Sequence, residues 1–157
     1  MLFRSRAGEL LTLASPTLVH EDRRNWCPQR FAGRASPYEV FTVTGKGGLK
    51  RQVAVSKILA IEVWKRQLPA PRVVEDREAN VVKHFDLLGG QAFSQAFSAH
   101  SKNTLGFSNG AHSLRHTFAI RRMIKLQIDG MDWDEAIQVL ANELGHFSKT
   151  NTLCYLR

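Results

Sequence analysis

The sequence predicts an α+β fold, mostly helical, with a small antiparallel β-sheet packed on one side of the domain. The sheet is expected as a hairpin over residues 38–55, because residues 38–44 and 49–55 are rich in β-branched and aromatic side chains and flank a glycine-rich turn. Beyond residue 73, apolar side chains recur at helical spacing between turns that contain Gly and Asn. The length of 157 residues, with 43% hydrophobic and 23% charged residues, is sufficient for one domain with a hydrophobic core.

Short elements and a basic loop are expected in the first third of the chain. Residues 6–13 (RAGELLTL) combine leucines with good helix formers, which predicts a helix. Residues 17–22 have the composition of a short edge strand. Residues 22–37 show no hydrophobic period and contain Pro and Gly, which indicates a basic loop.

Helices are expected over most of the remaining chain. Ser56 is a suitable N-cap for a helix that extends to about Gln67 and ends before Pro69. Asp132 and Glu135 resemble a capping box at the start of a later helix. The apolar spacing in the second half predicts five further helices, over residues 73–85, 90–101, 112–128, 133–144 and 148–156.

The charge of the chain favours a polyanionic partner. The formal net charge is +8 and the isoelectric point is near 10.0. Residues 1–60 contain ten Lys and Arg against four Asp and Glu. This part of the chain, with Lys50 and Arg51, is therefore the expected surface for contact with a nucleic-acid backbone, either DNA or RNA. A second basic group is expected on the solvated face of a helix: Arg121, Arg122 and Lys125.

The sequence favours a cytoplasmic protein associated with the nucleoid. No apolar run approaches the ~18 residues typical of a membrane span, so no membrane partner is expected. The two cysteines, Cys27 and Cys154, cannot form a disulfide framework and show no CxxC spacing. This use of cysteine is typical of a reducing compartment.

Polar residues with chemical potential are concentrated in the second half of the chain. His112 and Arg115 are three positions apart on a predicted helix, so they share a face and can point into one site. A planar guanidinium suits a phosphate, because it can bind two oxygens at once and keeps its charge at any physiological pH. His146 ends another predicted helix, and Tyr155 follows it by nine positions.

The order and spacing of these residues resemble the tyrosine recombinases, the phage integrase family. His-Ser-Leu-Arg-His-Thr-Phe-Ala from His112, then Leu-Gly-His ending at His146, then Tyr155, is similar to the family's C-terminal signature. Arg-Ala-Gly-Glu-Leu-Leu from Arg6 is similar to its first-arginine motif, and Lys46 stands where the family has its hairpin lysine. The resemblance implies a catalytic domain over residues 1–157, with the core-binding domain and the C-terminal tail absent.

The resemblance implies cleavage and rejoining of DNA strands through a 3′-phosphotyrosine intermediate, as in site-specific recombination and integration of mobile elements. Tyr155 would be the nucleophile, since a phenol of pKa near ~10 can attack phosphorus and later leave. His112, whose residue type has a pKa near ~6.5, can accept its proton. Lys46 would protonate the departing 5′-oxygen. No metal ion or cofactor is needed.

The remaining residues of the predicted site bind or support the phosphate. Arg6 and Arg115 would hold the non-bridging oxygens, because without a metal fixed side chains must stabilise the charge of the transition state. His146 would donate a hydrogen bond to the phosphate. Glu9, three positions after Arg6, is expected to orient the site as an anion behind it, and His116 is expected to support it from the core.

Other interpretations remain open. An isolated tyrosine near the end of a chain is more often a packing residue than a nucleophile. The His112–His116 pair lacks the glutamate of the HExxH zinc motif, because Ser113 stands in its place. A type IB topoisomerase-like enzyme, which nicks and reseals strands, uses similar chemistry, and a DNA-binding remnant without cleavage is a third possibility. The expected partners are double-stranded DNA and, for a full-length protein, three further copies in a tetramer on DNA.

Overall fold

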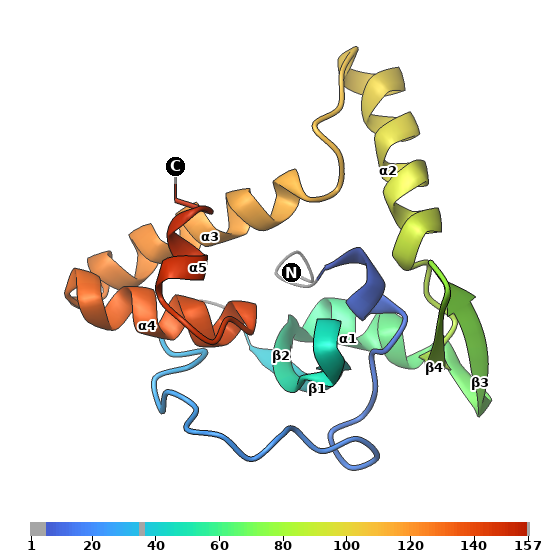
Figure 1. Cartoon of the computed structure of the whole chain (residues 1–157), viewed down its shortest axis with the longest axis horizontal. Coiled ribbons are helices and arrows are strands. Elements are labelled where there is room, and N and C mark those ends of the chain that lie inside the picture. The colour runs from blue at the N-terminus through green and yellow to red at the C-terminus, as the bar shows by residue number, and fades with distance from the viewer. Residues whose placement is uncertain (1–5, 35–36, 157) are drawn as a thin grey trace.

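A computed structural model describes residues 6–34 and 37–156, and it shows an α+β fold (Figure 1). Two antiparallel two-stranded sheets, β1–β2 and β3–β4, lie in the first half of the chain and helices dominate the second. None of the described helices is both long and apolar enough to cross a membrane. In chain order the elements are η1 (Ala7–Leu10), β1 (Tyr38–Thr44), η2 (Lys46–Gly48), β2 (Lys50–Ser56), α1 (Lys57–Trp64), β3 (Gln67–Asp76), β4 (Ala79–Phe85), α2 (Gly90–Leu105), α3 (Ser113–Ile128), α4 (Trp133–Leu144) and α5 (Thr150–Leu153).

The predicted hairpin over residues 38–55 is confirmed. Strands β1 and β2 pair in register from Tyr38 opposite Ser56 to Thr44 opposite Lys50. Their connection, η2, has Gly47 at φ 76°, a left-handed conformation that glycine adopts without steric cost. The sheet contributes half of one hydrophobic core, which also includes residues from α1 and β4: Leu13, Phe41, Val43, Val53, Val55, Ala60, Val63 and Phe85.

The helix predicted over residues 73–85 is wrong, because this segment forms the hairpin β3–β4. Its charged middle contains good helix formers, but four valines flank it. Val73 pairs with Val82, and Val74 with Val81, so β-branched side chains stack across the ladder. The turn places Arg77 at φ 51° and Glu78 at φ 64°.

The other elements were predicted with differing success. The helices expected over residues 90–101, 112–128 and 133–144 are present as α2, α3 and α4. Asp132 caps α4, where its Oδ1 accepts a hydrogen bond from the Glu135 amide at 2.8 Å. The helix expected over residues 6–13 is reduced to the 3₁₀ turn η1, and the one over 148–156 to α5. Residues 17–22 form no strand, and only an isolated bridge joins Ala14 to Thr42.

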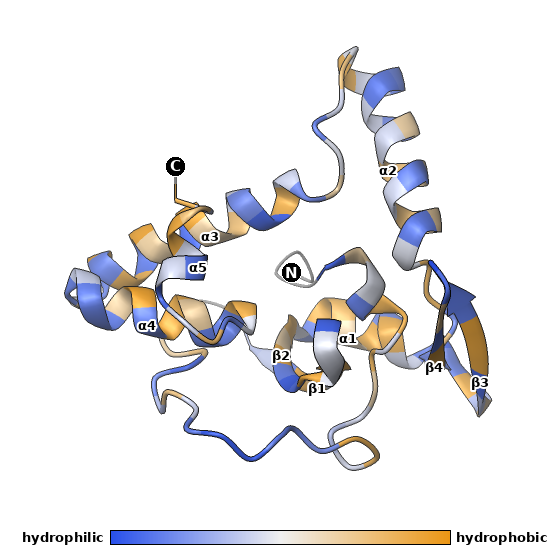
Figure 2. Cartoon of the chain, in the orientation of Figure 1, coloured by the Kyte–Doolittle hydropathy of each residue, from blue (hydrophilic) through white to orange (hydrophobic). Residues whose placement is uncertain are grey.

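Helices α3 and α4 form most of a second hydrophobic core (Figure 1). Tyr155 packs into it, along with Phe118, Met123, Leu126, Ile137, Leu140 and Leu144. Residues 22–34 form an irregular loop, as predicted, and this loop is bound to the end of α4. The amide of Cys27 donates to Asn142 Oδ1 at 2.9 Å, and that of Phe31 to Glu143 Oε1 at 2.9 Å. Figure 2 shows the loop as a largely hydrophilic segment.

Candidate active site

A cavity of about 840 Å³ brings four of the six predicted catalytic residues together. Arg6, which immediately precedes η1, lines one part of the cavity, and Lys46 of the β1–β2 turn lines another. His112 and Arg115 enter from the start of α3. The β3–β4 turn also lines the cavity through Asp76 and Arg77, which the sequence analysis missed because this segment was expected to be a helix. Basic side chains therefore outnumber acidic ones in the lining of the cavity.

Arg115 is held by the segment that ends α4. It is 2% exposed, and its Nη2 donates to the Leu144 carbonyl at 2.5 Å and lies 3.2 Å from Nε2 of His146. A guanidinium can only donate, so Nε2 accepts, and Nδ1 of His146 donates to Thr152 Oγ1 at 2.8 Å. His146 is therefore neutral and supports Arg115 in this structure. Its hydrogen bond to a phosphate stays a prediction.

The electrostatic surroundings of His146 agree with the neutral form. Burial, followed by the charges of Arg115, Arg6 and Arg51, lowers the pKa of His146 to about 4. The residue before it, Gly145, has φ 74°, and a Cβ at this position would lie 2.6 Å from Cδ of Arg51. A glycine is thus required both by the helix end and by the close approach of Arg51.

Tyr155 lies against the predicted acid–base and phosphate-binding residues. Its ring centroid is 5.4 Å from that of His112, 4.7 Å from that of His116 and 5.3 Å from that of His146. The Arg115 Cζ lies 5.4 Å from the same ring. Tyr155 is 6% exposed and is not among the residues that line the cavity. The fifth and sixth predicted residues, Tyr155 and His146, therefore contact the cavity residues without lining it.

His112 and His116 differ in their surroundings. His112 is exposed and reaches the cavity, whereas His116 is half-buried and packs edge-on against the His112 ring at 5.3 Å. Burial, and then the positive charges of His116, Arg115 and Arg6, lower the pKa of His112 below its ordinary value. His112 is therefore neutral at neutral pH, the form that can accept a proton.

Glu9 connects Arg6 to the interior, and its expected role of orienting the site stays a prediction. It is 5% exposed, and its Oε2 accepts from the Arg6 amide at 2.7 Å and from Arg51 Nη2 at 2.7 Å. Arg51 is itself 1% exposed, and its Nη1 donates to the Glu143 carbonyl at 2.9 Å. This corrects the prediction that Arg51 contacts DNA, because its guanidinium is used inside the protein. Its neighbour Lys50 is exposed, and the contact of Lys50 with DNA stays a prediction.

Glu143 is a buried acid that the sequence analysis missed. It is fully buried, and its carboxylate accepts from Arg122 Nη2 at 2.8 Å, from Arg34 Nη2 at 3.0 Å and from the Phe31 amide. Arg122 is 6% exposed, so its expected place on a solvated helix face is wrong. The available signal was a charged residue in the VLANELGH segment, beside the apolar run Val139 to Ala141 and next to Leu144, because buried charges require partners.

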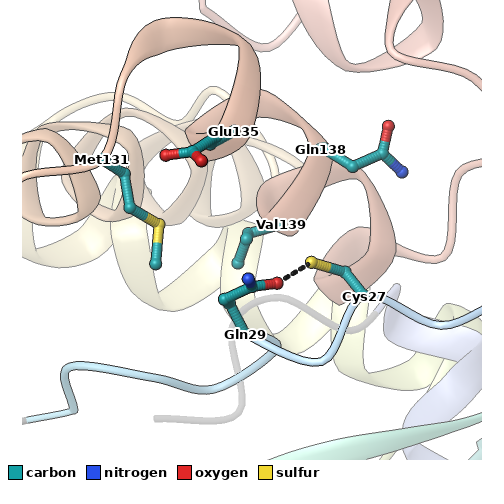
Figure 3. A pocket seen from close by; sticks show the side chains of 6 residues that line it. All are labelled: Cys27, Gln29, Met131, Glu135, Gln138 and Val139. Carbon is teal, nitrogen blue, oxygen red and sulfur yellow. Dashed lines mark hydrogen bonds between the residues drawn. The ribbon is translucent and has the colours of Figure 1, made fainter.

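A smaller cavity of about 170 Å³ lies between the loop 22–34 and α4 (Figure 3). Its walls include Met131 and Val139, and Sγ of Cys27 donates to Oε1 of Gln29 at 2.9 Å across its edge. None of the predicted site residues lines it. Within residues 6–34 and 37–156, no three His, Cys, Asp or Glu side chains are grouped to hold a metal ion.

Comparisons of this chain with protein-family models, with curated proteins and with solved structures found no match.

Proposed function

We propose that this chain is the catalytic domain of a tyrosine recombinase, which cleaves and rejoins DNA strands in site-specific recombination or integration. The observation that supports this most strongly is the convergence of Arg6, Lys46, His112 and Arg115 on one cavity. Tyr155 contacts two of them through its ring. Two arginines, a lysine, a histidine and a phenol can together supply the charge stabilisation, the acid and base, and the nucleophile for phosphoryl transfer without a metal.

The proposed reaction begins with attack of the Tyr155 hydroxyl oxygen on a phosphodiester. The phenolic proton passes to the neutral His112, and Arg6 and Arg115 stabilise the charge on the non-bridging oxygens. Lys46 donates a proton to the 5′-oxygen as the P–O bond breaks, which leaves a 5′-hydroxyl and a 3′-phosphotyrosine. Attack by a 5′-hydroxyl of another strand reverses these steps and releases Tyr155.

The burial of Tyr155 adds a requirement to this scheme. Tyr155 is only 6% exposed, so a scissile phosphate would have to reach a side chain that is largely buried in this structure. The same burial favours a second candidate function, DNA binding without cleavage. A type IB topoisomerase-like reaction would use the same residues and differ in whether strands are exchanged. The proposed partners are double-stranded DNA and, for the full-length protein, a tetramer on DNA, with a cytoplasmic, nucleoid-associated location.

A nicked suicide substrate tests the proposal directly. Incubation in EDTA should trap a covalent protein–DNA adduct through a 3′-phosphotyrosine, and Tyr155→Phe should abolish it. Tyr38→Phe is the matched control, because Tyr38 is the other tyrosine of the chain and is exposed on β1. An adduct that persists in Tyr155→Phe, or that forms only with a divalent metal, contradicts the proposed mechanism. Duplex binding without any adduct favours the second candidate.

A further inference from the structure

The loop 22–34 and the residue after His146 form a ladder in which aromatic rings alternate with guanidinium groups. Arg24 Cζ lies 4.6 Å from the ring centroid of Phe147 and 4.4 Å from that of Trp26. Arg30 Cζ lies 4.4 Å from the Trp26 ring and 5.1 Å from the Phe31 ring. Each guanidinium therefore lies between two rings, in contacts that are favourable for the π-systems.

One end of this ladder is closed and the other is open. Phe31 is 6% exposed and packs edge-on against Tyr38 at 6.1 Å. Phe147, at the opposite end, is 76% exposed, and Arg24 lies over its ring. The ladder therefore presents a large aromatic surface to solvent.

Hydrogen bonds fix Trp26 and Arg30, the side chains of the ladder that follow Arg24 beneath Phe147. Both terminal nitrogens of Arg30 donate to the carboxylate of Glu21 at 2.9 Å, and the Trp26 indole donates to the Asp22 carbonyl at 3.0 Å. The loop amides bound to Asn142 and Glu143 join this assembly to α4. A supported ring loses less conformational freedom on binding than a mobile one.

The open end lies beside the candidate active site. Phe147 follows His146 directly in the chain, and Arg24 Nη2 donates to the His146 carbonyl at 3.4 Å. His146 in turn contacts Arg115 and the ring of Tyr155. Ser148 and Lys149 follow Phe147 in the chain, and the Arg24 guanidinium lies over its ring, so polar and charged side chains adjoin the ring.

We propose that Phe147 is a stacking platform for an unpaired nucleobase of the strand that enters the active site. This inference rests on the proposed function, since it assumes that the neighbouring site binds DNA. Bases stack on aromatic rings with little regard to sequence, and the arginine beneath the ring adds positive charge near the phosphodiester backbone. A paired base in a duplex already has neighbours on both faces, so the platform selects a base that has left the stack. An apolar protein partner would require a wider apolar surface around the ring.

Binding of a single-stranded oligonucleotide with one 2-aminopurine tests the platform. Stacking should quench the fluorophore on binding to the unmodified protein. Phe147→Ala should lose this quenching and weaken affinity about five- to 160-fold, the range expected for one stacked base. Phe147→Trp should keep both, whereas Phe147→Leu should lose the quenching. Phe107→Ala is the matched control, since Phe107 is 59% exposed between α2 and α3 and should leave both values unchanged.

Two results would overturn the platform. One is equal affinity of Phe147→Ala and the unmodified protein, with urea midpoints that show both to be folded. The other is equal binding of an oligonucleotide and of its fully abasic counterpart, which would assign all affinity to the backbone. The Tyr155 adduct assay separates this inference from the proposed function. Loss of stacking in Phe147→Ala without any adduct in the unmodified protein would retain the platform and reject the recombinase. An adduct with no effect of Phe147→Ala on binding would do the reverse.

Discussion

Replacing Glu143 with glutamine should destabilise the fold more than any surface substitution. The carboxylate is fully buried, and it accepts hydrogen bonds from Arg122 at 2.8 Å and Arg34 at 3.0 Å, besides the amide of Phe31. Glutamine has almost the same shape but no charge, so two largely buried guanidiniums lose their counter-ion. Removing one partner of a buried ion pair costs about 3–5 kcal/mol, which is a large part of the 5–15 kcal/mol that typically stabilises a domain.

Urea unfolding followed by tryptophan fluorescence would measure this loss. The chain has three tryptophans, and Trp26 lies in the loop that Glu143 anchors. Glu62→Gln is the matched control: Glu62 on α1 pairs with Lys65 and Arg66 just after the helix, and all three side chains are well exposed, so this substitution should hardly change the urea midpoint. A loss below about 1 kcal/mol for Glu143→Gln, at unchanged m-value, would refute the central role assigned to this acid.

Three further outcomes are expected. Lowering the pH from about 6.5 to about 4 should reduce the urea midpoint, because over this range the unfolded chain takes up a proton at His146, whereas in the folded chain His146 has a pKa of about 4. The urea midpoint of His146→Asn should fall less over the same range. An identical fall in both proteins would contradict the buried neutral histidine. Gly145→Ala should cost more stability than Gly106→Ala: both glycines have positive φ, worth about 1 kcal/mol, but only at Gly145 would the new Cβ meet a side chain, that of Arg51. Equal losses would show that Arg51 moves away freely. In duplex-DNA binding, Lys50→Ala should reduce the log–log salt slope by about 0.9 with stability unchanged, whereas Arg51→Ala should lower the urea midpoint; a salt slope unaffected by Lys50→Ala would remove Lys50 from the DNA-contacting surface.

The sequence predicted those elements whose local pattern and tertiary role agree. The first hairpin was predictable because Gly47 and its neighbours favour a turn between two strand-forming segments. The hairpin β3–β4 was not, because the helix formers around Arg77 compete with the valines on either side, and only strand pairing decides between them. Local pattern is thus sufficient where the two agree and ambiguous where they differ.

The sequence motifs pointed to residues that the structure places around one cavity, but not to the buried side chains that hold these residues. The order and spacing of the motifs led to Arg6, Lys46, His112 and Arg115, which line one cavity. The burial of Arg51 and Arg122 could not be foreseen, since arginine is ordinarily exposed and the acids that retain them, Glu9 and Glu143, are distant in sequence. The contact of Arg24 with Phe147 likewise depends on a loop that has no periodic pattern.

The two hydrophobic cores divide the candidate site between them. Arg6 belongs to the part built around the first hairpin, whereas Arg115 belongs to the helical part. The distance between these two guanidiniums therefore depends on how the two parts are joined. Arg51 joins them, because it donates to the carboxylate of Glu9 and to the carbonyl of Glu143. In the proposed reaction, a shift of one part against the other would change how the two guanidiniums are spaced around a phosphate, while the side chains within each core could keep their contacts.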